Sequence, residues 1–270
     1  MKAFGYTQAT KTLTPESFQA IELPTPEAHG HDILVEVSAI SVNPVDAKIR
    51  ANVSSEQGYK VIGWDAVGTV KAVGDKVTLF NVGDRVYYAG DLTRQGSNAE
   101  FQLVDERIVG KAPTSISNAE IAALPLTAIT AYEMLFDRLA LDHRNHYIQT
   151  PPTLLIVGAA GGVGSIMIQL AKVLCPEVTV IATASRDESQ AWCKKMGADH
   201  VISHSEKDGG IQKQLQAIGI SQVSHIASLT HTSSHFDDYV EVIKPQGKIC
   251  LIDDPATPLN LQALKMKGRE

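Results

Sequence analysis

Residues 153–164 read Thr-Leu-Leu-Ile-Val-Gly-Ala-Ala-Gly-Gly-Val-Gly, an apolar run that breaks into glycines. An apolar run without polar alternation is typical of a parallel strand buried on both faces. Residues 165–174 carry apolar side chains at helical spacing, so we expect a helix there. The free N–H groups and the positive dipole end of a helix start favour an anion. The order of strand, glycine turn and helix therefore predicts a site for a pyrophosphate.

The glycines of this turn follow a dinucleotide-binding pattern in part. Gly161 and Gly164 match the second and third glycines of Gly-x-Gly-x-x-Gly, whereas Ala159 replaces the first. Glycine lets the backbone turn sharply and approach an anion closely. The alternative is a glycine-rich turn in another kind of α/β protein. We favour a dinucleotide site, whose cofactor-binding residues are Gly158, Ala160, Gly161, Gly162, Val163 and Gly164.

The composition of the 270 residues bounds the possible partners. A hydrophobic content of 44% is enough to form the core of one large domain or the cores of two moderate ones. The net charge of −6, with no run of Lys or Arg, argues against a nucleic-acid partner. No apolar run approaches the length needed to cross a bilayer, and residues 1–6 do not resemble a signal peptide. We expect a cytoplasmic protein that acts on a small molecule and has no membrane partner.

The cysteines favour neither a disulfide framework nor a structural zinc site. Cys175, Cys193 and Cys250 are the only three, and none belongs to a Cys-x-x-Cys pair.

Residues 2–111 carry short strand patterns and turns, which predict a β-rich domain. Strands are expected at 33–37, 67–73, 85–88 and 101–104. Ser117-x-x-Glu120 is a capping box that starts a helix, and Leu124-Pro125 interrupts that helix. A second helical pattern covers 127–141, and a polar loop then ends in Pro151-Pro152.

The remainder of the chain alternates strands with helices. Strands are expected at 154–157, 178–183, 200–203, 225–229 and 248–253, with helices such as 188–196 and 236–243 between them. Five strands in this alternation predict a doubly wound parallel sheet, whose complete form has six. Residues 255–270 give no convincing sixth strand or closing helix, so the chain could end early.

The residues after the second of these strands favour NADPH over NADH. NAD enzymes carry Asp or Glu there for the ribose 2′-hydroxyl, and this chain has Ser185 and Arg186 instead. A serine hydroxyl and a guanidinium suit a 2′-phosphate. The alternative is ordinary loop composition.

Six motifs in order resemble the medium-chain dehydrogenase/reductase family, specifically its zinc-independent quinone oxidoreductase group, often labelled zinc-type alcohol dehydrogenase-like. The motifs are Ser-Val-Asn-Pro-Val-Asp at 41–46, Ile-Gly-Trp-Asp-Ala-Val-Gly at 62–68, Val-Gly-Asp-Arg-Val at 82–86, Leu-Pro-Leu-Thr-Ala at 124–128, Val-Gly-Ala-Ala-Gly-Gly-Val-Gly at 157–164 and Met-Gly-Ala-Asp at 196–199. The resemblance implies a GroES-like substrate domain at 1–125 and a Rossmann NADP(H)-binding domain at 126–270. It also implies a homodimer, which the absence of the family's C-terminal return segment puts in doubt.

The same resemblance argues against zinc catalysis, so we expect no metal. Asn43 and Trp64 stand where zinc-binding relatives have Cys and His ligands, and neither can replace thiolate or imidazole. Without a Lewis acid, the accessible substrates are activated acceptors such as quinones and α,β-unsaturated carbonyls.

The resemblance also implies individual roles. It places Asn43 and Thr127 beside the nicotinamide as catalytic residues, and Trp64 in the substrate cleft. The alternatives are a turn asparagine, a helix-start threonine and a core tryptophan. His204 stands where relatives have a tyrosine near the adenosine phosphate.

Loops at the carboxyl ends of the later strands are expected to border the cofactor, which adds Thr230, His231 and Asp253. For Asp253 the alternative is a plain turn residue. His225, His231 and His235 suggest a metal, but residues 230–234 are predicted as a loop, which gives no helical ligand spacing.

We therefore expect a zinc-independent, NADPH-dependent oxidoreductase that transfers hydride to a quinone or an α,β-unsaturated carbonyl compound. The alternatives are an NADP(H)-binding protein with little or no catalysis and a zinc alcohol dehydrogenase.

Overall fold

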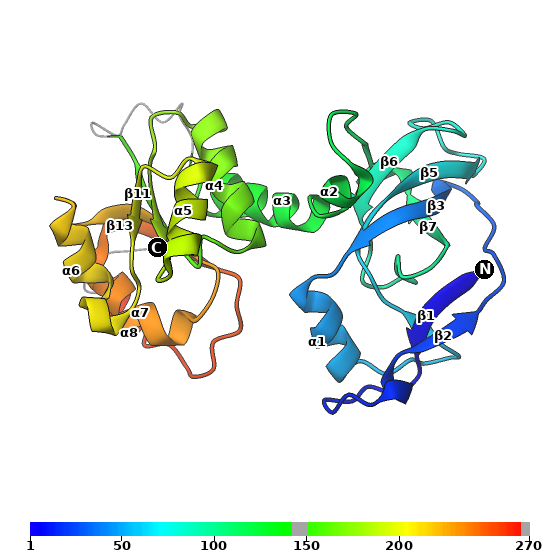
Figure 1. The fold of residues 1–270 in the computed structure, drawn as a ribbon, viewed down its shortest axis with the longest axis horizontal. Coiled ribbons are helices and arrows are strands. Elements are labelled where there is room, and N and C mark those ends of the chain that lie inside the picture. The colour runs from blue at the N-terminus through cyan, green and yellow to red at the C-terminus, as the bar shows by residue number, and fades with distance from the viewer. Residues whose placement is uncertain (142–150, 266–270) are drawn as a thin grey trace. The chain divides into compact units, whose positions relative to one another are not determined.

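A computed structural model describes residues 1–141 and 151–265. The chain divides into two compact units, Met1–Leu126 and Thr127–Glu270 (Figure 1), one residue after the predicted domain boundary. None of the helices in the described ranges is long and apolar enough to cross a membrane.

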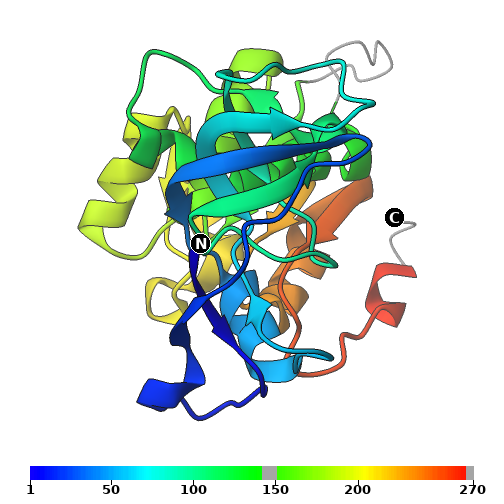
Figure 2. The same cartoon turned by 90° about the vertical axis from the view of Figure 1, so that its right-hand side faces the viewer.

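The N-terminal unit consists of two antiparallel sheets, drawn in blue to green in Figure 2. Five strands follow the order β7-β3-β5-β6-β8, and three follow the order β2-β1-β4. Alternate residues such as Ile33 and Val35 fill the core of the larger sheet, so the predicted β-rich domain and its four strands are confirmed. The bounds are β1 (Lys2–Tyr6), β2 (Gln19–Glu22), β3 (Asp32–Ser41), β4 (Lys60–Val61), β5 (Asp65–Val73), β6 (Arg85–Ala89), β7 (Phe101–Asp105) and β8 (Gly110–Lys111).

Short helices complete this unit. They are η1 (Pro15–Ser17), α1 (Pro44–Asn52), η2 (Glu106–Ile108) and α2 (Asn118–Ala122). The capping box before α2 is confirmed, because Ser117 Oγ accepts the Glu120 N–H and the Glu120 carboxylate accepts the Ser117 N–H. Sequence reasoning missed α1, whose buried residues Asp46 and Arg50 are charged and give no apolar helical pattern.

The C-terminal unit is a parallel sheet of order β11-β10-β9-β12-β13, which confirms the predicted doubly wound sheet. Leu154 and Ile156 of β9 face one buried cluster, whereas Leu155 and Val157 face another on the opposite side. The bounds of its strands are β9 (Thr153–Val157), β10 (Thr179–Thr183), β11 (His200–Ile202), β12 (Val223–Ser228) and β13 (Ile243–Leu251). The glycine turn leads into the first helix after β9, as predicted. The chain enters this unit within α3 (Pro125–Tyr132). The helices that follow are η3 (Glu133–Arg138), α4 (Gly162–Leu174), α5 (Asp187–Met196), η4 (Glu206–Asp208), α6 (Gly210–Ala217), α7 (Thr232–Val242) and α8 (Gln262–Lys265).

Several predicted boundaries differ from the structure. The helix expected at 127–141 begins at Pro125 and changes to the π-helical turn η3. The polar loop expected before Pro151 falls on 142–150, outside the described residues. Within residues 255–265, Gln262–Lys265 form one helical turn, α8, where no helix was expected.

The loop predicted at 230–234 was wrong from Thr232 onward, because α7 begins there. His231 precedes it in the left-handed conformation at φ 54°, and the Asp253 carboxylate accepts the Thr232 N–H at 2.9 Å. The fifth strand also begins earlier than predicted, at Ile243, and ends two residues before Asp253.

Candidate functional site

The glycine turn has the geometry of an anion site. The backbone leaves β9 at Gly158 with φ +80°, and α4 begins after Gly161 as its N-cap. A Cβ on Gly164 would lie 2.6 Å from Ala159 Cα and closer still to the Ala159 carbonyl oxygen. Glycine is therefore required at position 164 by close contact between the helix and the turn. Gly161 and Gly162 are exposed, so the N–H groups that open α4 are accessible to a ligand.

Two threonines flank this turn within the C-terminal unit. A Cβ on Gly162 would lie 3.1 Å from Thr127 Cγ2, and one on Gly158 would lie 2.7 Å from Thr230 Cγ2. The structure thus brings Thr127 and Thr230 to opposite ends of the predicted phosphate-binding turn.

The predicted 2′-phosphate residues lie at the end of the neighbouring strand. Ser185 and Arg186 are both exposed in the loop between β10 and α5, where Arg186 is the N-cap. Thr183, the last residue of β10, accepts the Gly158 N–H through Oγ1 at 3.1 Å. This hydrogen bond connects the end of β10 to the glycine turn.

Three imidazoles surround a cavity of about 150 Å³ at the carboxyl ends of β9 and β12. The rings of His204 and His235 are 5.6 Å apart and meet edge to face, and His231 Nδ1 lies 2.8 Å from Thr230 Oγ1. Burial, together with the neighbouring His231, lowers the pKa of His204, so its ring is neutral at pH 7. His204 Nδ1 is buried and has no hydrogen-bond partner within residues 1–141 and 151–265. The cavity therefore offers an uncharged His204 ring, with its Nδ1, to a ligand at neutral pH.

The structure does not bring together the three histidines considered for a metal. His225 is buried on β12, with Nδ1 2.9 Å from Ser224 Oγ, and does not line the cavity. Across 1–141 and 151–265, no three His, Cys, Asp or Glu side chains are grouped so that they could hold a metal ion.

Asp253 has a structural partner. Its carboxylate accepts both the backbone N–H and the hydroxyl of Thr232. Thr232 Oγ1 lies 2.7 Å from Ser228 Oγ, which is also 2.9 Å from the Tyr239 hydroxyl. This buried network, Ser228–Thr232–Tyr239–Asp253, fixes the start of α7 beside the histidine cavity.

In the N-terminal unit, Asn43 is bonded to two carboxylates. Its side-chain Nδ2 donates to Asp65 Oδ2 at 2.8 Å, and its backbone N–H donates to Asp46 Oδ2 at 2.8 Å. Asn43 is 6% exposed and Asp65 is fully buried. Burial raises the pKa values of both Asp46 and Asp65.

Trp64 lies in the core, packed with Tyr6 and Ile62 at 2% exposure. Its Nε1 is buried and has no hydrogen-bond partner among the residues that the structure describes. The two positions that correspond to zinc ligands therefore hold an amide bonded to Asp65 and an indole. Neither donor suits Zn²⁺, so we derive no step that uses this metal.

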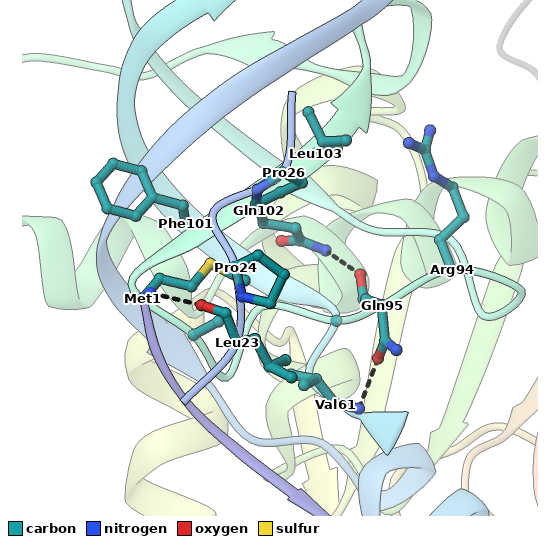
Figure 3. A pocket seen from close by; sticks show the side chains of 12 residues that line it. Met1, Leu23, Pro24, Pro26, Val61, Arg94, Gln95, Phe101, Gln102 and Leu103 are labelled. Carbon is teal, nitrogen blue, oxygen red and sulfur yellow. Dashed lines mark hydrogen bonds between the residues drawn. The ribbon is translucent and has the colours of Figure 1, made fainter. Parts of the chain in front are cut away.

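A separate cavity of about 400 Å³ lies in the N-terminal unit (Figure 3). Its polar side chains already have partners: Gln95 Oε1 accepts the Val61 N–H, and Gln102 Nε2 donates to the Gln95 carbonyl. None of the predicted catalytic residues lines it, so we leave it out of the candidate site. Its apolar lining includes Met1, Leu23, Pro24, Pro26, Phe101 and Leu103.

The structure adds two residues that sequence reasoning did not assign to the site, Asp46 and Asp65. The Asn-x-x-Asp spacing at 43–46 is a helix-cap signal that could have indicated Asp46. Asp65 is 22 residues from Asn43, and no local pattern indicates their contact.

A glycine turn between the first strand and first helix of a doubly wound sheet defines a dinucleotide-binding Rossmann domain. Comparison with family models agrees. Residues 29–114 match the alcohol dehydrogenase GroES-like domain, and residues 162–269 match the zinc-binding dehydrogenase domain.

Among curated sequences, the chain is 45% identical to a zinc-type alcohol dehydrogenase-like protein of Staphylococcus aureus (strain Mu50 / ATCC 700699) over 268 residues. That match covers 99% of this chain and 78% of the relative. A 2-methylene-furan-3-one reductase of Solanum lycopersicum is 34% identical over 221 residues, which cover 77% of this chain and 53% of the relative.

Solved structures show the same likeness. A protein of Rhizobium etli CFN 42, assigned as a zinc-dependent alcohol dehydrogenase, is 49% identical at a TM-score of 0.93. The match covers 100% of this chain and 77% of that one. The Escherichia coli quinone oxidoreductase complexed with NADPH is 25% identical at a TM-score of 0.78. That match covers 99% of this chain and 78% of the other. The chain therefore belongs to the medium-chain dehydrogenase/reductase superfamily of oxidoreductases, in the group of zinc-type alcohol dehydrogenase-like proteins.

Proposed function

We propose that this protein is a zinc-independent reductase that uses NADPH to reduce a quinone or an α,β-unsaturated carbonyl compound. The observation that carries the proposal is the Asn43–Asp65 hydrogen bond. It shows an amide bonded to a carboxylate at the position where zinc-dependent relatives require a thiolate ligand. An amide can donate to an oxygen that gains negative charge, but it cannot activate an unactivated ketone as a Lewis acid does. The name of the tomato relative indicates an enone, and that of the Escherichia coli structure indicates a quinone.

The glycine turn and its neighbours are the proposed cofactor site. The exposed N–H groups at the start of α4 bind the pyrophosphate, and the close approach at Gly164 keeps helix and turn together. Ser185 and Arg186 bind the 2′-phosphate, since a guanidinium pairs well with phosphate oxygens. Thr230, His231, His204 and Asp253 complete the surroundings of the cofactor, and Thr127 contacts the nicotinamide.

The bound cofactor supplies a hydride. Asn43 donates a hydrogen bond to the acceptor oxygen as it gains charge, which lowers the barrier without a metal. Trp64 precedes Asp65 in the chain and is packed with Tyr6 and Ile62.

The test follows the loss of NADPH absorbance with a small quinone, an enal and a saturated ketone, and repeats each assay with NADH. We expect turnover of the quinone or the enal with NADPH, weaker turnover with NADH, and none of the saturated ketone. Activity should survive prolonged treatment with a zinc chelator. Turnover confined to simple alcohols and ketones, and lost on chelation, would contradict the proposal.

A further inference from the structure

Asp65 is a buried carboxylate with a separate donor for each oxygen. Oδ1 accepts the Leu126 N–H at 2.7 Å, and Oδ2 accepts from Asn43 Nδ2 at 2.8 Å. Both contacts are donated to Asp65 by N–H groups, so each of its oxygens acts as an acceptor. The end of the Asn43 amide that faces Asp65 must therefore be its NH₂ group.

The backbone of Asn43 is fixed at the start of α1. Asn43 is the N-cap of α1, and its backbone carbonyl accepts the Asp46 N–H at 3.0 Å. The Asp46 carboxylate accepts the Asn43 backbone N–H in return. A primary amide has one carbonyl oxygen and two N–H bonds. With one of these N–H bonds donated to Asp65, the second remains to donate.

We propose that Asp65 is a positioning residue that holds the Asn43 amide in the one orientation that presents its second N–H to the substrate oxygen. The proposal rests on the function proposed above, in which Asn43 touches the substrate. A reversed amide would place its oxygen against the Asp65 carboxylate, where two acceptors repel, and would move both N–H bonds away from the position of this donor.

Asp65→Asn separates this role from simple packing, because the introduced amide has almost the same shape. Its oxygen is retained by the Leu126 N–H, so its NH₂ group faces the NH₂ group of Asn43. Asn43 then has to reverse, and its donor to the substrate is lost. Asp75→Asn is the matched control, since Asp75 also accepts a backbone N–H, that of Gly30 at 2.8 Å, but at an exposed site.

The first measurement does not depend on activity. Selective ¹⁵N-asparagine labelling gives the side-chain amide resonances of Asn43, assigned by their absence in Asn43→Ala. We expect Asp65→Asn to shift both resonances and Asp75→Asn to leave them in place. The Asp46 carboxylate also contacts Asn43. A pH titration of these resonances in Asp46→Asn therefore separates the effects of the two carboxylates. Unchanged Asn43 resonances in Asp65→Asn would overturn the proposal, even if the protein reduced no acceptor.

The second measurement is kinetic. We expect Asp65→Asn to lower kcat at least tenfold, with KM for NADPH within twofold of the parent and no large change in melting temperature. Asn43→Asp should destabilise the protein, because two carboxylates then face each other. The double variant Asn43→Asp/Asp65→Asn should fold again, but its kcat should stay low. The carboxylate at position 43 would then have no N–H to donate to the substrate. Recovery of kcat in that double variant, or full activity in Asp65→Asn despite shifted amide resonances, would overturn the positioning role. A parent protein that reduces neither quinones nor enones would instead refute the proposed function.

Discussion

Gly164→Ala tests whether the glycine turn is closed by direct backbone contact. The added methyl group would lie 2.6 Å from both Ala159 Cα and the Ala159 carbonyl carbon, whereas non-bonded carbons prefer about 3.5–4.0 Å. The turn and α4 must then separate by about 1 Å, and both belong to the core of the C-terminal unit. Overpacking of this kind costs about 1–3 kcal/mol. For a unit of this size, about 2 kcal/mol lowers the melting temperature by roughly 4–8 °C.

Gly161→Ala is the matched control in the same turn. Its Cβ would meet only the Gly158 carbonyl oxygen, at an ordinary 3.5 Å, and its φ of −75° suits any residue. Its stability should stay within about 0.5 kcal/mol of the parent. If the pyrophosphate lies against this turn, the methyl group should still weaken NADPH binding at least about tenfold, equivalent to about 1.4 kcal/mol.

Two assays separate these effects. Thermal unfolding followed by circular dichroism measures the loss of stability, and calorimetric titration measures NADPH binding. A Gly164→Ala protein as stable as the parent would refute the close contact between α4 and the turn. A Gly161→Ala protein that binds NADPH normally would show that the pyrophosphate lies elsewhere.

Three further outcomes are expected. Arg186→Ala should weaken NADPH binding about tenfold or more and leave NADH binding unchanged in titration calorimetry, because only NADPH carries the 2′-phosphate; equal losses for both would contradict the assigned role. Burial, with Lys248 nearby, lowers the pKa of His225 to about 4, against about 6.5 when unfolded, so the unfolded chain binds more protons between these values. The free energy of unfolding measured in urea should therefore fall by up to about 3 kcal/mol as the pH drops from about 6.5 to 4. His225→Gln should make this free energy less dependent on pH. An unchanged pH dependence in His225→Gln would refute the assignment to His225. Ser117→Ala should lower the free energy of unfolding in urea by about 1 kcal/mol, because the Glu120 N–H loses its side-chain cap. Ser117→Asn should keep most of the parent's stability, because asparagine also caps helices.

The sheet of the C-terminal unit was predictable because its signals are local. β9 and β10 are centred on apolar runs, and glycines mark the turn after β9 and the end of α5. The start of α7 was not predictable in this way, since the group that caps Thr232 belongs to Asp253, 21 residues further along. The helix α1 was missed for a different reason: its buried face carries Asp46 and Arg50, so no apolar periodicity marks it.

The candidate site shows the same division. Gly161, Gly164 and the loop with Ser185 and Arg186 follow from spacing along the chain. The contact between Asn43 and Asp65 depends on strand β5 passing beside the start of α1, which only the tertiary structure provides. Sequence alone therefore indicated the amide but not the carboxylate that orients it.

The Ser228–Thr232–Tyr239–Asp253 network has a consequence for how this part of the chain can evolve. Each hydroxyl in it serves a neighbour, so removing one leaves another buried polar group without a partner. Single replacements should all be harmful, and their penalties should not add when combined. Natural drift or a mutagenesis library can therefore change these four positions only as a set, for instance by replacing several hydroxyl groups with apolar side chains in one step.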